Sequence, residues 1–137
     1  MVTKASGFEE LPHTADWSIR VWAASLRGLF VEAALGMNAL AGIQPAQTPR
    51  MARIFSTQAA DDESLLVLFL SELVYAAEQE HLVFDRFDIK ISSSKLTATM
   101  SGAPILSISK SIKAVTYHNL QIRKTRMGFQ VEIVFDV

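Results

Sequence analysis

Residues 61–80, DDESLLVLFLSELVYAAEQE, decide the fold class of this chain. Apolar residues recur here at the three- and four-residue spacing of one helix face, which predicts an amphipathic α-helix. Asp61 or Asp62 is suited to cap its N-terminus, because a carboxylate there accepts backbone N–H groups and faces the positive end of the helix dipole. We expect the helix to end near Glu80. The residues expected on its buried face are Leu65, Leu66, Phe69, Leu70, Leu73 and Ala76.

The chain after this helix is predicted to consist of strands. Between residues 87 and 100, apolar and polar side chains alternate on either side of a turn at residues 92–95, as in a β-hairpin. Residues 112–124, IKAVTYHNLQIRK, and residues 129–137, FQVEIVFDV, predict two further strands separated by a turn at TRMG. Residues 102–111, GAPILSISKS, predict a loop or an irregular sheet edge. This part of the sequence therefore predicts a meander of about four strands.

The chain before the helix alternates between element types. Residues 17–22, WSIRVW, follow the turn-like LPHTAD and alternate as in a strand. Ser25 is a suitable N-cap for a following helix, and Gly42 is placed to end it. Residues 42–50, with two prolines, predict a loop, and residues 53–57 predict a short strand. This order indicates an α+β protein in which two helices pack on one face of a mostly antiparallel sheet.

The composition fits a single domain over residues 1–137, since half of the residues are hydrophobic and a fifth are charged. The lack of cysteine excludes disulfides, thiolate nucleophiles and cysteine-bound zinc. A formal net charge of −1 argues against strong direct binding to nucleic acid. The N-terminus has no apolar signal segment, and the apolar run at residues 64–77 is broken by Glu72 and falls short of a membrane span. We therefore expect a cytoplasmic protein without membrane association.

Acidic groups near both ends of the chain form the first candidate site. Asp16 precedes the first predicted strand, where capping a turn is the usual role of such a residue. Asp136 stands beside the α-carboxylate of Val137. If the first and last strands are neighbours, these three carboxylates form an anionic pole that needs a cation or protons. Oxygen ligands favour Ca²⁺ or Mg²⁺ over zinc; the alternative is a strand that simply ends in solvent.

Other candidate functional sites have weaker support in the sequence. His13, His81 and His118 lack the close spacing of zinc ligands, and His81, after the predicted helix, is expected to be exposed. The sequence contains neither a Gly-x-Ser-x-Gly elbow nor a glycine-rich phosphate loop. A basic cluster in the C-terminal third is explained most simply as a solvated face, although its lysine at position 113 could oppose the anionic pole. The cluster comprises Lys110, Lys113, Arg123, Lys124 and Arg126.

Three short motifs resemble the archease family: HTAD at residues 13–16, KAVTYH at 113–118 and FDV at 135–137. Residues 68–84, LFLSELVYAAEQEHLVF, also resemble the second helix of that family and the strand after it. The resemblance spans nearly the whole chain, and the motifs are specific in combination. It implies a fold built around a strand-helix-strand-strand module, which agrees with the order of elements predicted above.

The resemblance implies a metal site formed by Asp16, Asp136 and Val137, binding Ca²⁺ or Mg²⁺. Lys113 matches the motif lysine and is expected near the site as a functional residue that does not bind the metal. The residues expected to support the site without binding the metal are His13, Thr14 and His118.

The resemblance also implies an accessory protein rather than a stand-alone enzyme. Archeases act on the RtcB-type RNA ligase, which joins RNA ends in tRNA splicing or RNA repair, and promote its guanylylation and multiple turnover. An older proposal for the family is a chaperone or specificity role toward a tRNA or DNA methyltransferase. A third hypothesis is a metal-dependent phosphoesterase using the same carboxylates, which is disfavoured because the sequence offers no clear general base.

The sequence departs from the family pattern at a few positions. Trp17 follows HTAD, where small or aliphatic residues are usual, and Asn119 follows TYH. Residues 103–112 lack the charged, proline-rich character of the family loop before the motif lysine. These departures concern the surface that selects a partner more than the metal site.

Overall fold

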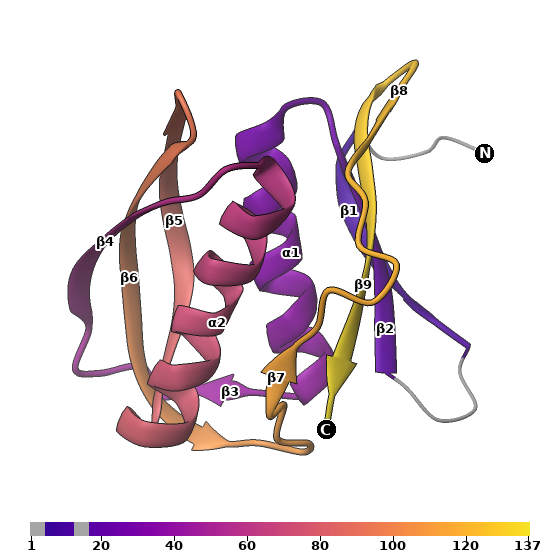
Figure 1. Cartoon of the computed structure of the whole chain (residues 1–137). Coiled ribbons are helices and arrows are strands. Elements are labelled where there is room, and N and C mark those ends of the chain that lie inside the picture. The colour runs from indigo at the N-terminus through magenta and orange to yellow at the C-terminus, as the bar shows by residue number, and fades with distance from the viewer. Residues whose placement is uncertain (1–4, 13–16) are drawn as a thin grey trace.

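The computed structural model describes residues 5–12 and 17–137 of the chain. Neither helix within these residues combines the length and apolar character needed to cross a membrane. The elements of the described chain are, in order, β1 (Gly7–Leu11), β2 (Trp17–Ala23), α1 (Leu26–Ala41), β3 (Gln44–Pro45), β4 (Met51–Gln58), α2 (Asp62–Glu80), β5 (Leu82–Ser92), β6 (Lys95–Ser107), β7 (Ala114–Val115), β8 (Arg123–Thr125) and β9 (Gly128–Asp136) (Figure 1).

The strands form two sheets, and the two helices lie between them (Figure 1). The first sheet has the order β1-β2-β9-β7, with β8 also paired to β9; the second has the order β3-β6-β4, with β5 also paired to β6. Every strand pairing in the described chain is antiparallel. The α+β class with two helices and antiparallel strands is confirmed. The single sheet of the prediction is instead two sheets, because each helix is apolar over a wide surface and contacts strands on both sides.

Both helices begin and end where local sequence signals place them. The Ser25 side chain accepts a hydrogen bond from the backbone N–H of Gly28 at 3.1 Å, and Gly42 ends α1 with a φ of 64°. For α2, the carboxylate that caps the helix is that of Asp61, which accepts the N–H of Ser64 at 2.7 Å. Hydrogen bonds from the backbone and the side chain of Ser64 hold the pKa of Asp61 below its ordinary value. The predicted caps are therefore confirmed, and Asp61 is the N-cap of the second helix.

The core is centred on Phe69 of α2. Its ring, which is fully buried, stacks on Phe30 of α1 with the centroids 6.0 Å apart and meets the edge of Phe87 of β5 at 5.7 Å. Aromatic pairs at these separations add favourable contact to the burial of apolar area. One side chain thus connects both helices to the second sheet. The predicted buried face of α2 is confirmed at Leu65, Leu66, Phe69, Leu70, Leu73 and Ala76.

The sequence predicts a loop or an irregular edge over residues 102–111, but β6 continues through the first part of this segment to Ser107. Gly102 permits this, since a Cβ there would overlap the carbonyl oxygen of Val83 on β5. The pairing of β5 with β6 shifts register between Phe84 and Arg86. The extra residue of this bulge, Asp85, lies on β5. On β6, Gly102 and Ala103 are both buried, which breaks the alternation in the sequence.

The long strand predicted over residues 112–124 is wrong. Only β7, two residues long, and β8, three residues long, form there. Between them the N–H of Leu120 bonds to the carbonyl of Tyr117 at 3.1 Å, and Asn119 has a φ of 51°, which makes a turn. The strand β1, which the sequence pattern did not predict, lies along β2.

An ion-pair row crosses the outer surface of the first sheet. The Arg20 guanidinium bonds to Glu9 Oε1 of β1 at 2.8 Å and to Glu132 Oε1 of β9 at 3.1 Å. These carboxylates, Glu132 foremost, raise the pKa of Arg20. The row joins three neighbouring strands on the face opposite the helices.

Candidate functional site

The start of β2 and the end of β9 lie side by side. Trp17, the first residue of β2, pairs with Phe135 of β9. The first strand of the sequence prediction and the last strand are therefore neighbours, which was the condition for an anionic pole. On the other edge of β9, Ala114 of β7 pairs with Asp136. We call the end of the molecule formed by Lys113, Asp136 and Val137 the C-terminal pole.

Two different interactions hold the end of β9. The carbonyl of Asp136 accepts the N–H of Lys113 at 2.8 Å, whereas the half-buried Val137 side chain packs against the core. Asp136 itself is exposed, and its carboxylate forms no ion pair with any described residue. The pole thus presents the carboxylate of Asp136 on an anchored backbone.

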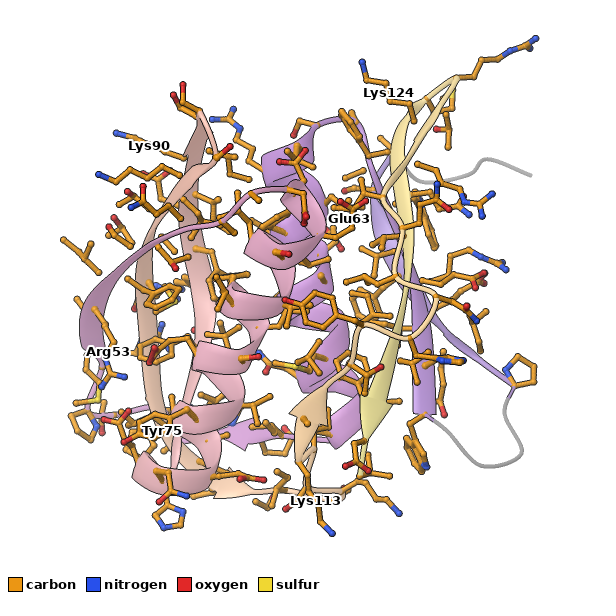
Figure 2. All side chains as sticks on the ribbon, in the orientation of Figure 1. Arg53, Glu63, Tyr75, Lys90, Lys113 and Lys124 are labelled. Carbon is orange, nitrogen blue, oxygen red and sulfur yellow. The ribbon has the colours of Figure 1, made fainter. Side chains whose placement is uncertain are left out.

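Two lysines lie on the segment that leads into β7. Figure 2 shows Lys113 extending from the end of the molecule at which β9 ends. Lys110 places its Nζ 4.9 Å from the ring centroid of Trp17, a cation–π contact. The backbone N–H groups of Ser109 and Lys110 both donate to the carbonyl of Ala41, at 3.0 and 2.9 Å, which ties the segment to the C-terminal end of α1. The sequence placed Lys110 in a basic cluster but did not reveal its contact with Trp17.

His118 lies in the turn after β7. The hydroxyl of Thr116 accepts the N–H of His118 at 3.2 Å and donates to the carbonyl of Val134 at 2.9 Å. The Asn119 amide nitrogen lies 3.3 Å from His118 Nε2. Among the described residues, none of these contacts joins His118 to Asp136, so its supporting role at the metal site stays a prediction.

Three of the predicted site residues, His13, Thr14 and Asp16, lie outside the described residues, and their roles stay predictions. Within residues 5–12 and 17–137, no group of three or more histidine, aspartate or glutamate side chains could hold a metal ion. The described part contributes the oxygen donors of Asp136 and Val137. Carboxylate oxygens are the donors that Ca²⁺ and Mg²⁺ prefer, so these residues fit a hard cation that takes further ligands from elsewhere.

A cavity of about 430 Å³, which the sequence did not predict, lies behind the C-terminal pole. It is bounded by the C-terminal ends of α1 and α2, by β5, and by the segment after β6. Ile112 lines it and directly precedes Lys113, so the wall of the cavity continues into the pole. His81 also lines it; this histidine ends α2 with a φ of 56° and is exposed, as predicted. Sequence periodicity could not reveal the cavity because its lining comes from several separate elements.

Comparison with known sequences finds similarity along nearly the whole chain. A family model described as the Archease protein family (MTH1598/TM1083) matches residues 8–137. Protein archease of Methanosarcina barkeri is 32% identical over 147 residues, covering 100% of both chains. Protein archease of Methanopyrus kandleri is 29% identical over 138 residues, covering 95% of this chain and 99% of its own.

Solved structures share the fold. An archease from Thermotoga maritima, described as a possible chaperone, superposes with a TM-score of 0.72 at 21% identity, covering 94% of this chain and 96% of its own. Protein 1598 of Methanobacterium thermoautotrophicum superposes with a TM-score of 0.69 at 22% identity, covering 96% and 99%. At these identities the likeness establishes the architecture alone.

Proposed function

The chain belongs to the archease family, and from this premise we propose that it is a cytoplasmic, metal-binding accessory protein that activates an RtcB-type RNA ligase in tRNA splicing or RNA repair. The observation that supports this proposal is the pairing of β2 with β9, with Trp17 opposite Phe135. This pairing brings the strand that directly follows Asp16 alongside the strand that ends at Asp136. The motif that contains Asp16 thus directly precedes a strand that pairs with the strand ending at Asp136.

In this proposal Asp16, Asp136 and the α-carboxylate of Val137 hold Ca²⁺ or Mg²⁺. A bound divalent cation supplies positive charge that can attract and orient phosphate or carboxylate oxygens. The chain contributes the placement of its ligands. Lys113 holds the backbone of Asp136 through its own N–H, and its ammonium group adds positive charge at the same end of the molecule.

The test is multiple-turnover ligation by a cognate RtcB-type ligase, with and without this protein. We expect stimulation to be lost with Asp16→Ala and with Asp136→Asn, because each removes a charged oxygen ligand. Asp88→Asn is the matched control, since Asp88 is also an exposed strand aspartate but lies on β5 of the other sheet. Undiminished stimulation by both site variants, or an equal loss with the control, would refute the proposal.

A second test addresses the metal directly. If the α-carboxylate of Val137 is a ligand, a peptide tag fused after Val137 should weaken Ca²⁺ or Mg²⁺ binding measured by calorimetry. The same tag fused at the N-terminus is the control and should leave the affinity unchanged. Equal affinity for both tagged forms would exclude that ligand.

A chaperone or specificity role toward an RNA or DNA methyltransferase is the alternative, and the Thermotoga maritima relative, described as a possible chaperone, supports it. Affinity purification of the protein that is tagged at its N-terminus, with no tag after Val137, distinguishes the two functions. Recovery of a ligase supports the first proposal, whereas recovery of a methyltransferase without a ligase supports the second.

A further inference from the structure

One edge of β9 is left open between β7 and β8. These two short strands pair with opposite ends of β9. Near β7, the N–H of Thr116 bonds to the carbonyl of Val134 at 3.1 Å. Because backbone groups of alternate residues point to the same side of a strand, the next N–H and C=O on this edge are those of Glu132. Within the described chain, no hydrogen bond closes the edge at this residue.

The opening lies in a depression of about 660 Å³ beside the loop that joins β7 to β8. Figure 1 shows the path of this loop from β7 to β8. The loop is held at both ends: at Thr116, and at Ile122, whose N–H donates to Glu63 Oε2 of α2 at 2.9 Å. The depression is therefore formed by the folded chain itself. Its polar and aromatic lining consists of Tyr117, Asn119, Gln121, Arg123, Gln130 and Glu132.

This lining combines a ring with paired donors and acceptors. Tyr117 is 58% exposed, so its ring is open to a flat ligand. The backbone of Glu132 offers a donor and an acceptor side by side, and the amides of Gln121 and Gln130 offer more. Nucleobases carry donors and acceptors on their edges and stack on aromatic side chains. An added peptide strand would need several consecutive open backbone groups, whereas the open edge here is one residue long.

The charges around the depression suit a phosphate-bearing ligand. The carboxylate of Glu132 is engaged by Arg20 at 3.1 Å, and because Arg20 also pairs with Glu9 at 2.8 Å, it compensates the charge of Glu132 only in part. Arg123 lines the depression, and the exposed Lys124 and Arg126 follow it in the β8 hairpin. None of the three forms an ion pair with any residue that the structure describes, and Lys124 places its Nζ 5.9 Å from the ring centroid of Phe129. Figure 2 shows Lys124 at this end of the first sheet. Together they provide a local positive surface on a chain whose formal net charge is only −1.

We propose that this depression binds one unpaired nucleotide of a single-stranded nucleic acid. The base stacks on Tyr117 and bonds to the open edge at Glu132, while the phosphates lie toward Arg123, which lines the depression, with Lys124 as the next cation along the hairpin. That the strand is RNA rests on the proposed function; the nucleotide site itself does not. Binding is weak, because only a few cations contribute.

The first experiment maps the site on the isolated protein by amide NMR. Titration with uridine 5′-monophosphate and with an oligouridylate of about eight nucleotides should shift the amide signals of Tyr117, Glu132 and their neighbours. Ribose 5-phosphate, which lacks the base, should bind at least about fivefold more weakly than the mononucleotide. Equal binding of ribose 5-phosphate, or shifts confined to other parts of the molecule, would overturn the proposal.

The second experiment separates stacking and phosphate contacts from nonspecific attraction, by fluorescence anisotropy of the labelled oligouridylate. Tyr117→Ala should lower affinity roughly fivefold or more, and Tyr117→Phe should retain most of it. Lys124→Gln should weaken binding more than Lys90→Gln, a matched exposed lysine on β5 of the other sheet (Figure 2). Equal losses at both lysines, or none with Tyr117→Ala, would overturn the site. Because no ligase is present, these results are independent of the ligation assay.

Discussion

Gly36, in the interior of α1, is where the helix comes close to the first sheet. A Cβ at this position would lie 2.9 Å from Ile19 Cδ1 of β2, 2.9 Å from Phe8 Cγ of β1 and 3.1 Å from Phe8 Cβ. Ile19 is 1% exposed, so its Cδ1 can move away only by shifting against neighbouring core side chains. The two Phe8 atoms are close to the backbone, so relief on that side requires β1 itself to shift. Gly36→Ala therefore has two opposing effects: it raises the helix propensity of α1, and it forces a methyl group against Ile19 and Phe8.

The two effects can be weighed. Alanine in place of glycine inside a helix stabilises by roughly 1 kcal/mol. Forcing a methyl group into a packed interface costs roughly 1–3 kcal/mol, so we expect Gly36→Ala to lower the free energy of unfolding by about 1 kcal/mol net. For a chain of 137 residues this corresponds to a fall in Tm of roughly 3–5 °C.

Urea unfolding followed by circular dichroism measures this difference, and a double-mutant cycle assigns it. Phe8→Ala removes the Cγ atom, so the cost of Gly36→Ala should become smaller in that background. If Gly36→Ala stabilises the otherwise unchanged protein, or costs the same with and without the Phe8 ring, the close packing of α1 on β1 does not limit this position.

Three further changes test the fold. Gly102→Ala should lower the free energy of unfolding by more than about 3 kcal/mol, the upper end for ordinary substitutions, because its Cβ would overlap the carbonyl of Val83. A loss no larger than that of Gly36→Ala would contradict this. Phe69→Ala should lower the free energy of unfolding by roughly 3–5 kcal/mol in the same urea assay, since removal of a fully buried ring leaves a cavity. A loss below about 1 kcal/mol would show that neighbouring side chains fill that space. Asp61→Ala should lower Tm at neutral pH. The stability that this cap contributes is present above the ordinary pKa of 3.8 and is lost as pH falls through the lower pKa of the folded state. The Tm values of the unchanged protein and of Asp61→Ala should therefore converge in acid. A difference in Tm that persists at about pH 2 would argue against the Ser64 hydrogen bond as its source.

The elements that the sequence predicted well are those whose signals are local. Ser25, Gly42 and Asp61 each act on backbone groups within a few residues, and the structure confirms all three. The helical spacing of the α2 stripe likewise records which side of a single element is buried. The segments predicted poorly lack such a signal. Four apolar side chains of residues 112–124 pack on the core: Val115 from the short strand β7, and Ile112, Leu120 and Ile122 from residues outside strands.

The candidate site shows the same division. The sequence predicted Asp136, Val137 and Lys113 as site residues by their motifs, and the structure brings the backbones of Lys113 and Asp136 together with a hydrogen bond of 2.8 Å. The contact of Lys110 with Trp17 had no sequence signal, because it joins residues far apart in the chain.

By itself, the sequence determined the two helices and their caps, the strand character of most of the second half, and the motifs that identify the family. Only the tertiary structure decided that the strands divide into two sheets around the helix pair, that β2 lies beside β9, and that the edge of β9 is open at Glu132. The physical reason is that periodicity specifies which side of an element is apolar, but not which surface covers it. The Arg20–Glu132 pair joins residues 112 positions apart, and such pairings depend on how all the buried surfaces fit together at once.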